Sequence, residues 1–468
     1  PMLFSSIPFL YVFLPVVLLI YFLCPMSRKN LVLMVSGFLF YAWGEPVYVL
    51  LMLFSTLLDY TAGRVMERYR ENPKIRKAAL LTSVIINLSL LAVFKYSSFL
   101  VENINALFGI SLFNPDLPLP IGISFYTFQS MSYTIDLYRG DTKMQKSYIN
   151  YAAYVSMFPQ LVAGPIVRYD DVAAELENRT ITLDKIGEGA FLFAQGLAKK
   201  VLLANNIGIL WTNVKEMATA GSVPAVTAWL GILAFTFQIY FDFSGYSDMA
   251  RGMGRMLGFD FPDNFRYPYM SKSITDFWRR WHMTLGSWFR SYVYIPLGGN
   301  RKGTARTIRN LLITWMLTGL WHGASWNFLL WGLYFGVLLI IEKFFLGKYL
   351  EKLPGWLQQT YSFLLVVFGW VLFEMETPAL IGGFFGSMVG FGGFADKYSV
   401  YLLASYGLLM VLCMIASNNW VPRLVEMAGK KFPRVVSGCK PVYIVLALVF
   451  GTAFLVNSTY NPFLYFRF

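Results

Sequence analysis

Apolar runs of membrane-crossing length recur along the whole chain, and they constrain its fold more than any other feature. Of its 468 residues, 56% are hydrophobic and 14% are charged, whereas soluble domains carry about 25% charged residues. Several runs approach the ~20 apolar residues that cross a bilayer as a helix. The sequence therefore predicts an all-α, polytopic membrane helical bundle. We expect about eleven transmembrane helices, with re-entrant and amphipathic cytoplasmic helices, around a central passage.

The same runs indicate the domain organisation. Their even spread favours a single transmembrane domain over residues 1–468. Residues 248–309 hold many basic groups and no long apolar run, so we expect a largely cytoplasm-facing amphipathic segment there. No basic residue precedes Arg28, so the first run is expected to stay as a membrane helix rather than a cleaved signal. The expected spans are residues 7–24, 31–44, 46–62, 78–98, 120–138, 151–167, 190–212, 225–247, 310–322 with 324–342, 360–375, 401–417 and 441–458.

The net charge of +13 is spread over short loops between the apolar runs. This is the positive-inside pattern, in which Lys and Arg mark the cytoplasmic loops of a membrane protein. Loops 64–77 and 421–440, both rich in Lys and Arg, are therefore expected in the cytoplasm. Counting spans outward from these loops places both termini on the extracytoplasmic side. Because the membrane accounts for the charge, we expect the lipid bilayer as a partner and no nucleic acid.

Polar chemistry is concentrated in residues 276–332. This stretch contains both histidines of the chain, His282 and His322, together with many of its arginines and tryptophans. Ionisable residues within a membrane protein's helices indicate a functional site by default. Two histidines this far apart, without an HExxH pattern, predict no metal site.

His282 is interpreted on the assumption that residues 275–292 form one helix. On such a helix, His282 lies on an aromatic face, while Arg279 and Arg280 lie on the wetter side. The alternative is a structural histidine whose ring bonds a backbone carbonyl. The residue pattern leaves both interpretations open.

His322 follows an apolar run, residues 309–321, that begins next to a basic stretch. At ~1.5 Å per residue, this run places His322 roughly 20 Å from the cytoplasmic surface, within the bilayer. An ionisable side chain at that depth is costly unless it lines a cavity, and the neighbouring Gly319 and Gly323 permit close backbone approach. A neutral imidazole there accepts a proton from a hydroxyl or thiol in a transfer reaction. The alternative is a histidine that only packs helices together.

Other polar side chains interrupt the apolar runs, among them Gln129 and Asp242. Interhelical hydrogen bonding is one explanation for such residues. The other is that they line a polar passage through the bundle.

Long motifs throughout the chain resemble the membrane-bound O-acyltransferase (MBOAT) family, and within it the membrane subunits that acetylate alginate and other polysaccharides. The resemblance covers essentially the whole chain. The motifs are DFWRRWHMTL at 276–285, GLWHGASWNFLLWG at 319–332, SFYTFQSMSYTIDLYRG at 124–140, FPQLVAGPIVRY at 158–169, YFDFSGYSDMARGMGRMLGF at 240–259, YVYIPLGGNRKG at 292–303 and the terminal FLYFRF.

The resemblance implies a multi-pass acetyltransferase of the bacterial inner membrane. It implies transfer of acetyl from a cytoplasmic thioester, expected to be acetyl-CoA, to an extracytoplasmic polysaccharide such as alginate, with no bound cofactor. An extracytoplasmic SGNH-hydrolase-like acetyltransferase is the expected partner. His322 takes the place of the family's catalytic histidine, and His282 lies on the path to it. Further donor or channel candidates are Trp278, Arg279, Arg280, Trp281, Trp321, Asn327, Asp242 and Gln129.

Other functions remain open from the sequence. D-alanyl or other acyl transfer to a cell-wall polymer is one, because teichoic acid D-alanyl transferases look similar around both histidines. A membrane transporter or flippase and a structural scaffold are the others. YIPLGGNRKG favours the polysaccharide acetyltransferases, whereas Ser291 stands where alginate-type relatives commonly have an acidic residue.

Overall fold

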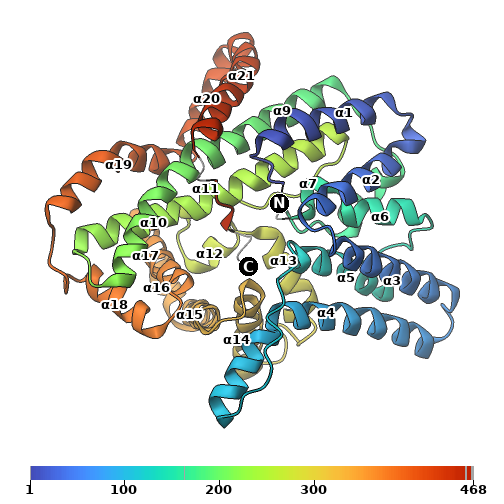
Figure 1. The fold of residues 1–468 in the computed structure, drawn as a ribbon, viewed down its shortest axis with the longest axis horizontal. Coiled ribbons are helices and arrows are strands. Elements are labelled where there is room, and N and C mark those ends of the chain that lie inside the picture. Colours follow the sequence, from blue (N-terminus) through green and yellow to red (C-terminus); the bar gives the residue numbers. More distant parts are fainter. Residues whose placement is uncertain (1, 163, 459–460, 465–468) are drawn as a thin grey trace. The chain divides into compact units, whose positions relative to one another are not determined.

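The computed structural model describes residues 2–162, 164–458 and 461–464, and the chain divides into two compact units. The first unit comprises residues 1–193 and 246–262, and the second comprises residues 194–245 and 263–468. The described residues form helices and loops and contain no strand (Figure 1). The predicted all-α fold is therefore confirmed.

The first unit is a helical bundle in which α3, α4 and α5 pack against one another and α2 packs against α6. The final part of α11 also belongs to it. Its elements are the π-helical segment η1 (Phe9–Phe13), α1 (Leu14–Leu23), α2 (Met26–Gly44), α3 (Val49–Arg68), α4 (Pro73–Phe108), α5 (Ile123–Arg139), α6 (Tyr148–Ser156), α7 (Phe158–Leu161), α8 (Tyr169–Glu177) and most of α9 (Leu183–Ala198).

The second unit contains the remaining helices, with a core of large aromatic side chains from α11, α12, α15 and α17. In this unit α14 packs along α15, and α15 packs on α17. Its elements are η2 (Lys199–Ala204), α10 (Asn205–Ala220), α11 (Ala225–Leu257), η3 (Pro268–Met270), α12 (Ile274–Trp278), α13 (Met283–Phe289), η4 (Arg290–Tyr294), α14 (Thr304–His322), α15 (Trp326–Ile341), η5 (Glu342–Leu346), α16 (Gly347–Leu350), α17 (Gly355–Glu374), α18 (Pro378–Met388), α19 (Lys397–Ala416), α20 (Trp420–Lys431) and α21 (Pro433–Asn457).

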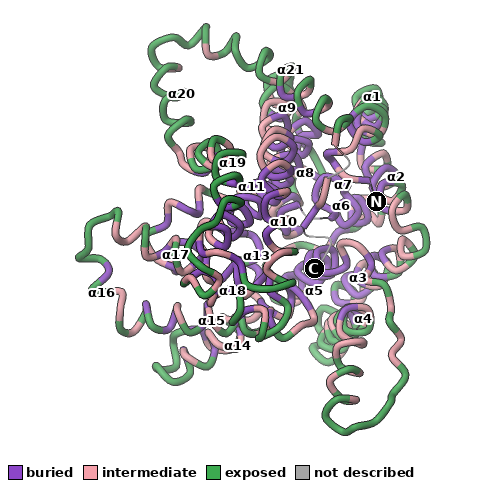
Figure 2. The backbone as a smooth tube through the Cα atoms, turned by 60° about the vertical axis from the view of Figure 1, so that its left-hand side comes forward, coloured by how far each residue is buried: buried purple, intermediate pink, exposed green. Residues whose placement is uncertain are grey.

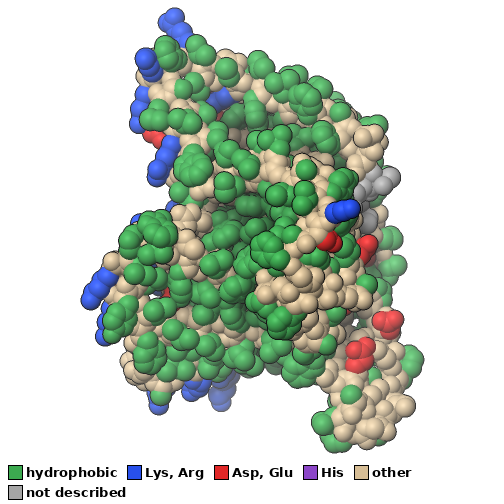
Figure 3. All heavy atoms as spheres, turned by 90° about the vertical axis from the view of Figure 1, so that its left-hand side faces the viewer, with side chains coloured by type: hydrophobic (Ala, Val, Ile, Leu, Met, Phe, Trp, Pro, Cys, Tyr) green, Lys and Arg blue, Asp and Glu red, His purple; other side chains and the backbone are tan. Residues whose placement is uncertain are grey.

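Seven helical stretches among the described residues are long and apolar enough to cross a membrane. They are α3, α4, α11, α17, α19, α21 and the continuous stretch Trp326–Leu350. Figure 3 shows one face, on the side of α19 in Figure 1, where hydrophobic side chains dominate and Lys and Arg gather near the margins. A polytopic membrane protein is thus confirmed. The count of about eleven spans stays a prediction, because other apolar helices, such as Phe9–Leu23, are shorter.

Local sequence explains where the longest helix begins and ends. The side-chain oxygen of Asn72 accepts the backbone N–H groups of Lys74 at 3.2 Å and Ile75 at 3.3 Å, and Pro73 occupies the first turn. Gly109, at φ 64°, ends α4 in the left-handed conformation that glycine adopts without strain. Between these signals the helix runs unbroken for 36 residues.

Buried polar groups of the first unit find partners on neighbouring helices. Asp59 of α3 accepts a hydrogen bond from Ser83 at 2.6 Å and another from Asn87 at 2.8 Å, both from α4. Such bonds join helices where water is absent. Helix α5 is buried along nearly all of its length, whereas every residue of α20 is exposed or half-buried (Figure 2).

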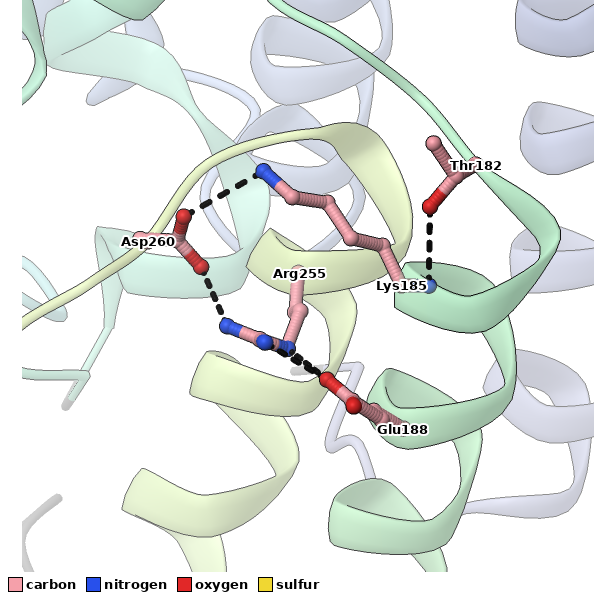
Figure 4. Close-up of polar contacts among 5 residues, drawn as sticks. All are labelled: Thr182, Lys185, Glu188, Arg255 and Asp260. Atoms are coloured by element: carbon pink, nitrogen blue, oxygen red, sulfur yellow. Dashed lines mark hydrogen bonds and ion pairs between the residues drawn. The ribbon is translucent and has the colours of Figure 1, made fainter.

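Ion pairs join the start of α9 to the end of α11 in the first unit (Figure 4). Asp260 lies 3.3 Å from Lys185 and 2.5 Å from Arg255, which also reaches Glu188 at 2.5 Å. The Thr182 hydroxyl accepts the Lys185 backbone N–H at 3.2 Å and so caps α9. Because most of these charges are half-exposed or exposed, the network orients the helix ends more than it stabilises the unit.

Candidate active site

The helical conformation is interrupted between α12 and α13, at the first of the two histidines. The assumption that residues 275–292 form one helix is wrong: α12 ends at Trp278 and α13 begins at Met283. The cause lies in a distant segment. Arg266 donates its backbone N–H to Arg280 O at 2.9 Å, and Met283 donates to Asn264 O at 3.0 Å. These bonds engage backbone groups that a continuous helix would pair internally.

His282 stands at this break with φ 45°. A residue other than glycine rarely adopts the left-handed region, because Cβ crowds the backbone there. Such strain is kept only where surrounding contacts enforce it, and it concentrates at functional sites.

Asn264 determines which nitrogen of His282 carries the proton. Its Oδ1 accepts the Thr284 backbone N–H at 3.3 Å and the Thr284 hydroxyl at 2.9 Å. A backbone N–H only donates, so the amide oxygen, not its nitrogen, faces this cluster. His282 Nδ1 lies 3.1 Å from the same oxygen and therefore donates to it. In the neutral ring, Nε2 is then the basic nitrogen.

Aromatic rings surround the imidazole of His282, which lies outside the seven membrane-length helices. The ring centroids of Phe243 and Trp321 lie 4.7 and 5.9 Å from it. Burial in this apolar setting disfavours the charged ring and lowers the pKa of His282 to about 3. The histidine is therefore neutral at physiological pH.

His322 is the last residue of α14, held where α14 and α15 approach closely. A Cβ added to Gly319 would lie 2.2 Å from Phe328 O, so only glycine permits this approach. The His322 ring is buried 5.0 Å from the Trp331 ring and 5.4 Å from the Phe373 ring.

Both histidines line one cavity of about 180 Å³ in the second unit. Trp278 and Trp281 line it as well, and most of the wall is apolar. The Thr318 hydroxyl, in the same wall, already donates to Thr314 O at 2.8 Å. The cavity thus brings the two imidazoles together in one mainly apolar space.

A larger pocket of about 970 Å³ adjoins this cavity and is strongly basic. Arg290, Tyr294 and Leu311 line both, so the two spaces lie side by side. Guanidinium and ammonium groups bind phosphate through charge-assisted hydrogen bonds. The basic residues of the larger pocket are Arg279, Arg290, Arg301, Lys302 and Lys343, and the acidic ones are Glu342 and Glu351.

Comparison with known proteins places this site in a family. A model of the membrane-bound O-acyltransferase family matches residues 141–364. The chain is 40% identical to the probable alginate O-acetylase of Pseudomonas putida, and the match covers 100% of both proteins. The chain belongs to the membrane-bound O-acyltransferase family. It is 31% identical to the peptidoglycan O-acetyltransferase of Helicobacter pylori, over 100% of this chain and 98% of that one.

A more distant match within the MBOAT relatives is the teichoic acid D-alanyltransferase of Bacillus subtilis. It is 29% identical over 54% of this chain and 67% of its own length. Family membership makes this protein an O-acyltransferase. The predicted resemblance and enzyme class are therefore confirmed.

The structure places the other candidate residues of this MBOAT protein in several settings. Arg279 lines the basic pocket, and the Trp321 ring lies 5.1 Å from the His322 ring. Arg280 forms an ion pair with Asp276 at 2.9 Å. Asn327 donates to Phe373 O at 2.9 Å and so ties α15 to α17.

Gln129 and Asp242, both candidates for a polar passage, lie in different units. The backbone oxygen of Gln129 accepts the Tyr154 hydroxyl at 3.1 Å in the first unit. In the second unit, Asp242 forms an ion pair of 2.5 Å with Lys200 and accepts the Leu464 N–H at 2.9 Å. Asp242 thereby anchors the C-terminal segment 461–464 in the protein interior.

Sequence reasoning missed several residues of the site. Asn264, the partner of His282, lies in a loop without a recognisable pattern. Arg290 and Tyr294 had only a weak signal, as polar residues shortly after the first histidine. Outside these pockets, the partner of Asp242 could have been found, because a lysine in an apolar run, such as Lys200, predicts an acidic partner. Within the described ranges, no three His, Cys, Asp or Glu side chains lie together as metal ligands would.

Proposed function

We propose that this protein transfers acetyl from a cytoplasmic thioester, acetyl-CoA, for O-acetylation of an extracytoplasmic polysaccharide such as alginate. The observation that carries the proposal is the single cavity lined by His282 and His322, next to a basic pocket that shares part of its wall. The acetylating enzymes named among its relatives act on alginate and on peptidoglycan, which supports a polysaccharide acceptor.

The basic pocket is the binding site proposed for the donor. Coenzyme A carries several phosphates, which match Arg279, Arg301 and Lys302. The donor's thioester end is small and uncharged, which suits the mainly apolar inner cavity. The two adjacent spaces therefore fit the two ends of one acyl thioester.

His322 is the proposed general base. It takes the proton of the acceptor hydroxyl while that oxygen attacks the thioester carbonyl carbon. A C–O bond forms, the C–S bond breaks, and the proton passes to the leaving thiolate, so His322 returns to its neutral state. His282 positions the donor, with its Nδ1 proton held by Asn264.

The acceptor side is proposed to be extracytoplasmic. The basic loops 64–77 and 421–440 indicate that both termini lie outside the inner membrane. An SGNH-hydrolase-like acetyltransferase is the proposed partner that receives acetyl or delivers it to the glycan.

The test is His322→Gln in the full-length protein. Gln keeps hydrogen bonding and approximate size but accepts no proton at useful pH. Release of labelled acetyl from acetyl-CoA, and polysaccharide acetylation in cells, should both fall by ~10²–10⁴-fold at unchanged abundance. Thr318→Val is the matched control in the same cavity, and it should keep near wild-type turnover because that hydroxyl bonds its own helix.

Retention of more than about a tenth of wild-type turnover by His322→Gln would contradict the general-base role. A transporter or scaffold, the alternative classes, would consume no thioester even in the wild-type protein. The similarity to a teichoic acid D-alanyltransferase keeps D-alanyl transfer as the alternative reaction. It predicts turnover of a D-alanyl thioester instead of acetyl-CoA.

A further inference from the structure

Helix α4 is much longer than a membrane crossing requires. Its 36 residues span about 54 Å at 1.5 Å per residue, against ~30 Å for the hydrocarbon core. Lys95, 3.1 Å from Ser124, marks the level at which α5 begins. The helix continues from Lys95 to Phe108, roughly 20 Å past that level. We call residues 101–116 the α4 tip, and Figure 2 shows it in the exposed and intermediate colours.

Side-chain hydrogen bonds hold the α4 tip in a defined shape. Asn105 pairs with both backbone groups of Leu112: its Nδ2 donates to the carbonyl at 3.2 Å, and its Oδ1 accepts the N–H at 2.8 Å. Asn114 donates to Glu102 at 3.3 Å and accepts the Asp116 N–H at 3.1 Å. The loop is thus fastened to the helix that precedes it.

This ordered tip presents large apolar side chains to its surroundings. Phe113 is 87% exposed, Leu107 76% and Phe108 67%. Exposed apolar patches on a rigid support are typical of interaction sites. A loop with no binding role would gain by carrying polar residues at these positions.

Charge and position favour a protein as the occupant. The helix starts beside the basic loop 64–77, so the tip lies on the opposite, extracytoplasmic side. The tip carries Glu102 and Asp116 and no Lys or Arg. Anionic headgroups repel this charge, and a symmetric contact between two copies would bring like charges together. A protein groove with an apolar floor and a basic rim is complementary to it.

We infer that the α4 tip is the docking site for the extracytoplasmic partner protein. The inference rests on the proposed function for the existence of that partner. It assigns the contact to Leu107, Phe108 and Phe113, with Glu102 and Asp116 at the rim. Docking there holds the partner on the extracytoplasmic side of the membrane. The histidine cavity takes no part in this contact.

The first arm of the test uses the full-length chain with Leu107→Ser and Phe113→Ser combined. Polysaccharide acetylation in cells should fall at least about tenfold, as for hot-spot residues. Acetyl release by the purified variant should stay within about twofold of wild type, because the tip takes no part in the chemistry. Gly382→Ala, at an exposed position with open space around it, serves as the matched control.

The second arm of the test changes the α4 tip at one position to detect the partner directly. A photo-crosslinking amino acid at position 113 should join the chain to a tagged SGNH-hydrolase-like protein, and Glu102→Lys with Asp116→Lys should abolish the adduct. An adduct with lipid alone, an adduct with a second copy, or unchanged acetylation in the first arm would overturn the inference. If the wild-type protein released no acetyl, the proposed function would fail, while the adduct would still decide whether the tip docks a protein.

Discussion

The ion pair between Lys200 and Asp242 yields the sharpest stability prediction. Both side chains are almost fully buried, with 1% and 2% exposure. Asp242 also accepts the Leu464 N–H, while Lys200 donates to Asn205 at 2.9 Å and to Pro462 O. Removal of either charge leaves the other buried without its counter-charge. Such a loss costs about 3–5 kcal/mol of folding free energy.

The double substitution should behave very differently from the sum of the single ones. Lys200→Met and Asp242→Leu alone should each cost about 3–5 kcal/mol, which adds to ~6–10 kcal/mol. Together they remove both charges and fill the space with apolar side chains. The cost should then be only about 3 kcal/mol, about 1 kcal/mol for each group that loses its bond: the Leu464 N–H, Asn205 Oδ1 and Pro462 O.

The measurement is unfolding of the purified full-length protein in mixed micelles, run as a double-mutant cycle. Hydrogen exchange of the C-terminal peptide supplies a local readout, since Asp242→Leu should speed exchange at Leu464. The exposed Lys430–Glu426 pair is the control, and Glu426→Gln should have no measurable effect. Single substitutions that cost under about 1 kcal/mol, or a double variant that costs the full sum, would refute this reasoning.

Two further predictions concern the histidine cavity. Because the pKa of His282 is about 3 when folded and ~6.5 when unfolded, its contribution to stability is complete above pH ~6.5 and is lost as pH falls toward 3. The free energy of unfolding of His282→Gln should therefore fall less than that of the wild type between pH 7.5 and pH 5 in unfolding titrations. Equal decreases would exclude the lowered pKa of His282. Gly319→Ala forces a Cβ to within 2.2 Å of Phe328 O and should cost about 1–3 kcal/mol and lower acetyl release, whereas Gly382→Ala, with open space, should do neither. A Gly319→Ala protein with unchanged stability would show that α14 and α15 can move apart at residue 319 without cost.

Local sequence determined most of the helical architecture. Residues 78–98 were expected as a span and lie within α4, and the expected span 225–247 lies within α11. The apolar run 309–321 lies within α14 and places His322 at its end. These predictions hold because a run's hydrophobic length and its capping residues act over a few turns of chain. The motifs around both histidines likewise indicated the family before any fold was considered.

Tertiary structure decided what lies between and around those helices. The segment 275–292 has the pattern of one helix, yet the backbone of residues 264–266 pairs with residues 280–283 and breaks it at His282. Asn264 determines the tautomer of His282 from 18 positions away in the sequence. No local pattern encodes a partner at that separation.

The same holds for Asp242, whose bond to Leu464 joins residues 222 positions apart. From sequence it was open whether Asp242 makes an interhelical hydrogen bond or lines a polar passage, and the folded chain pairs it with Lys200. The cavity itself also exists only after α12, α13 and α14 come together. Hydrophobic runs specify helices locally, whereas buried polar groups are satisfied by whichever partners the fold brings near, and those partners are distant in the chain.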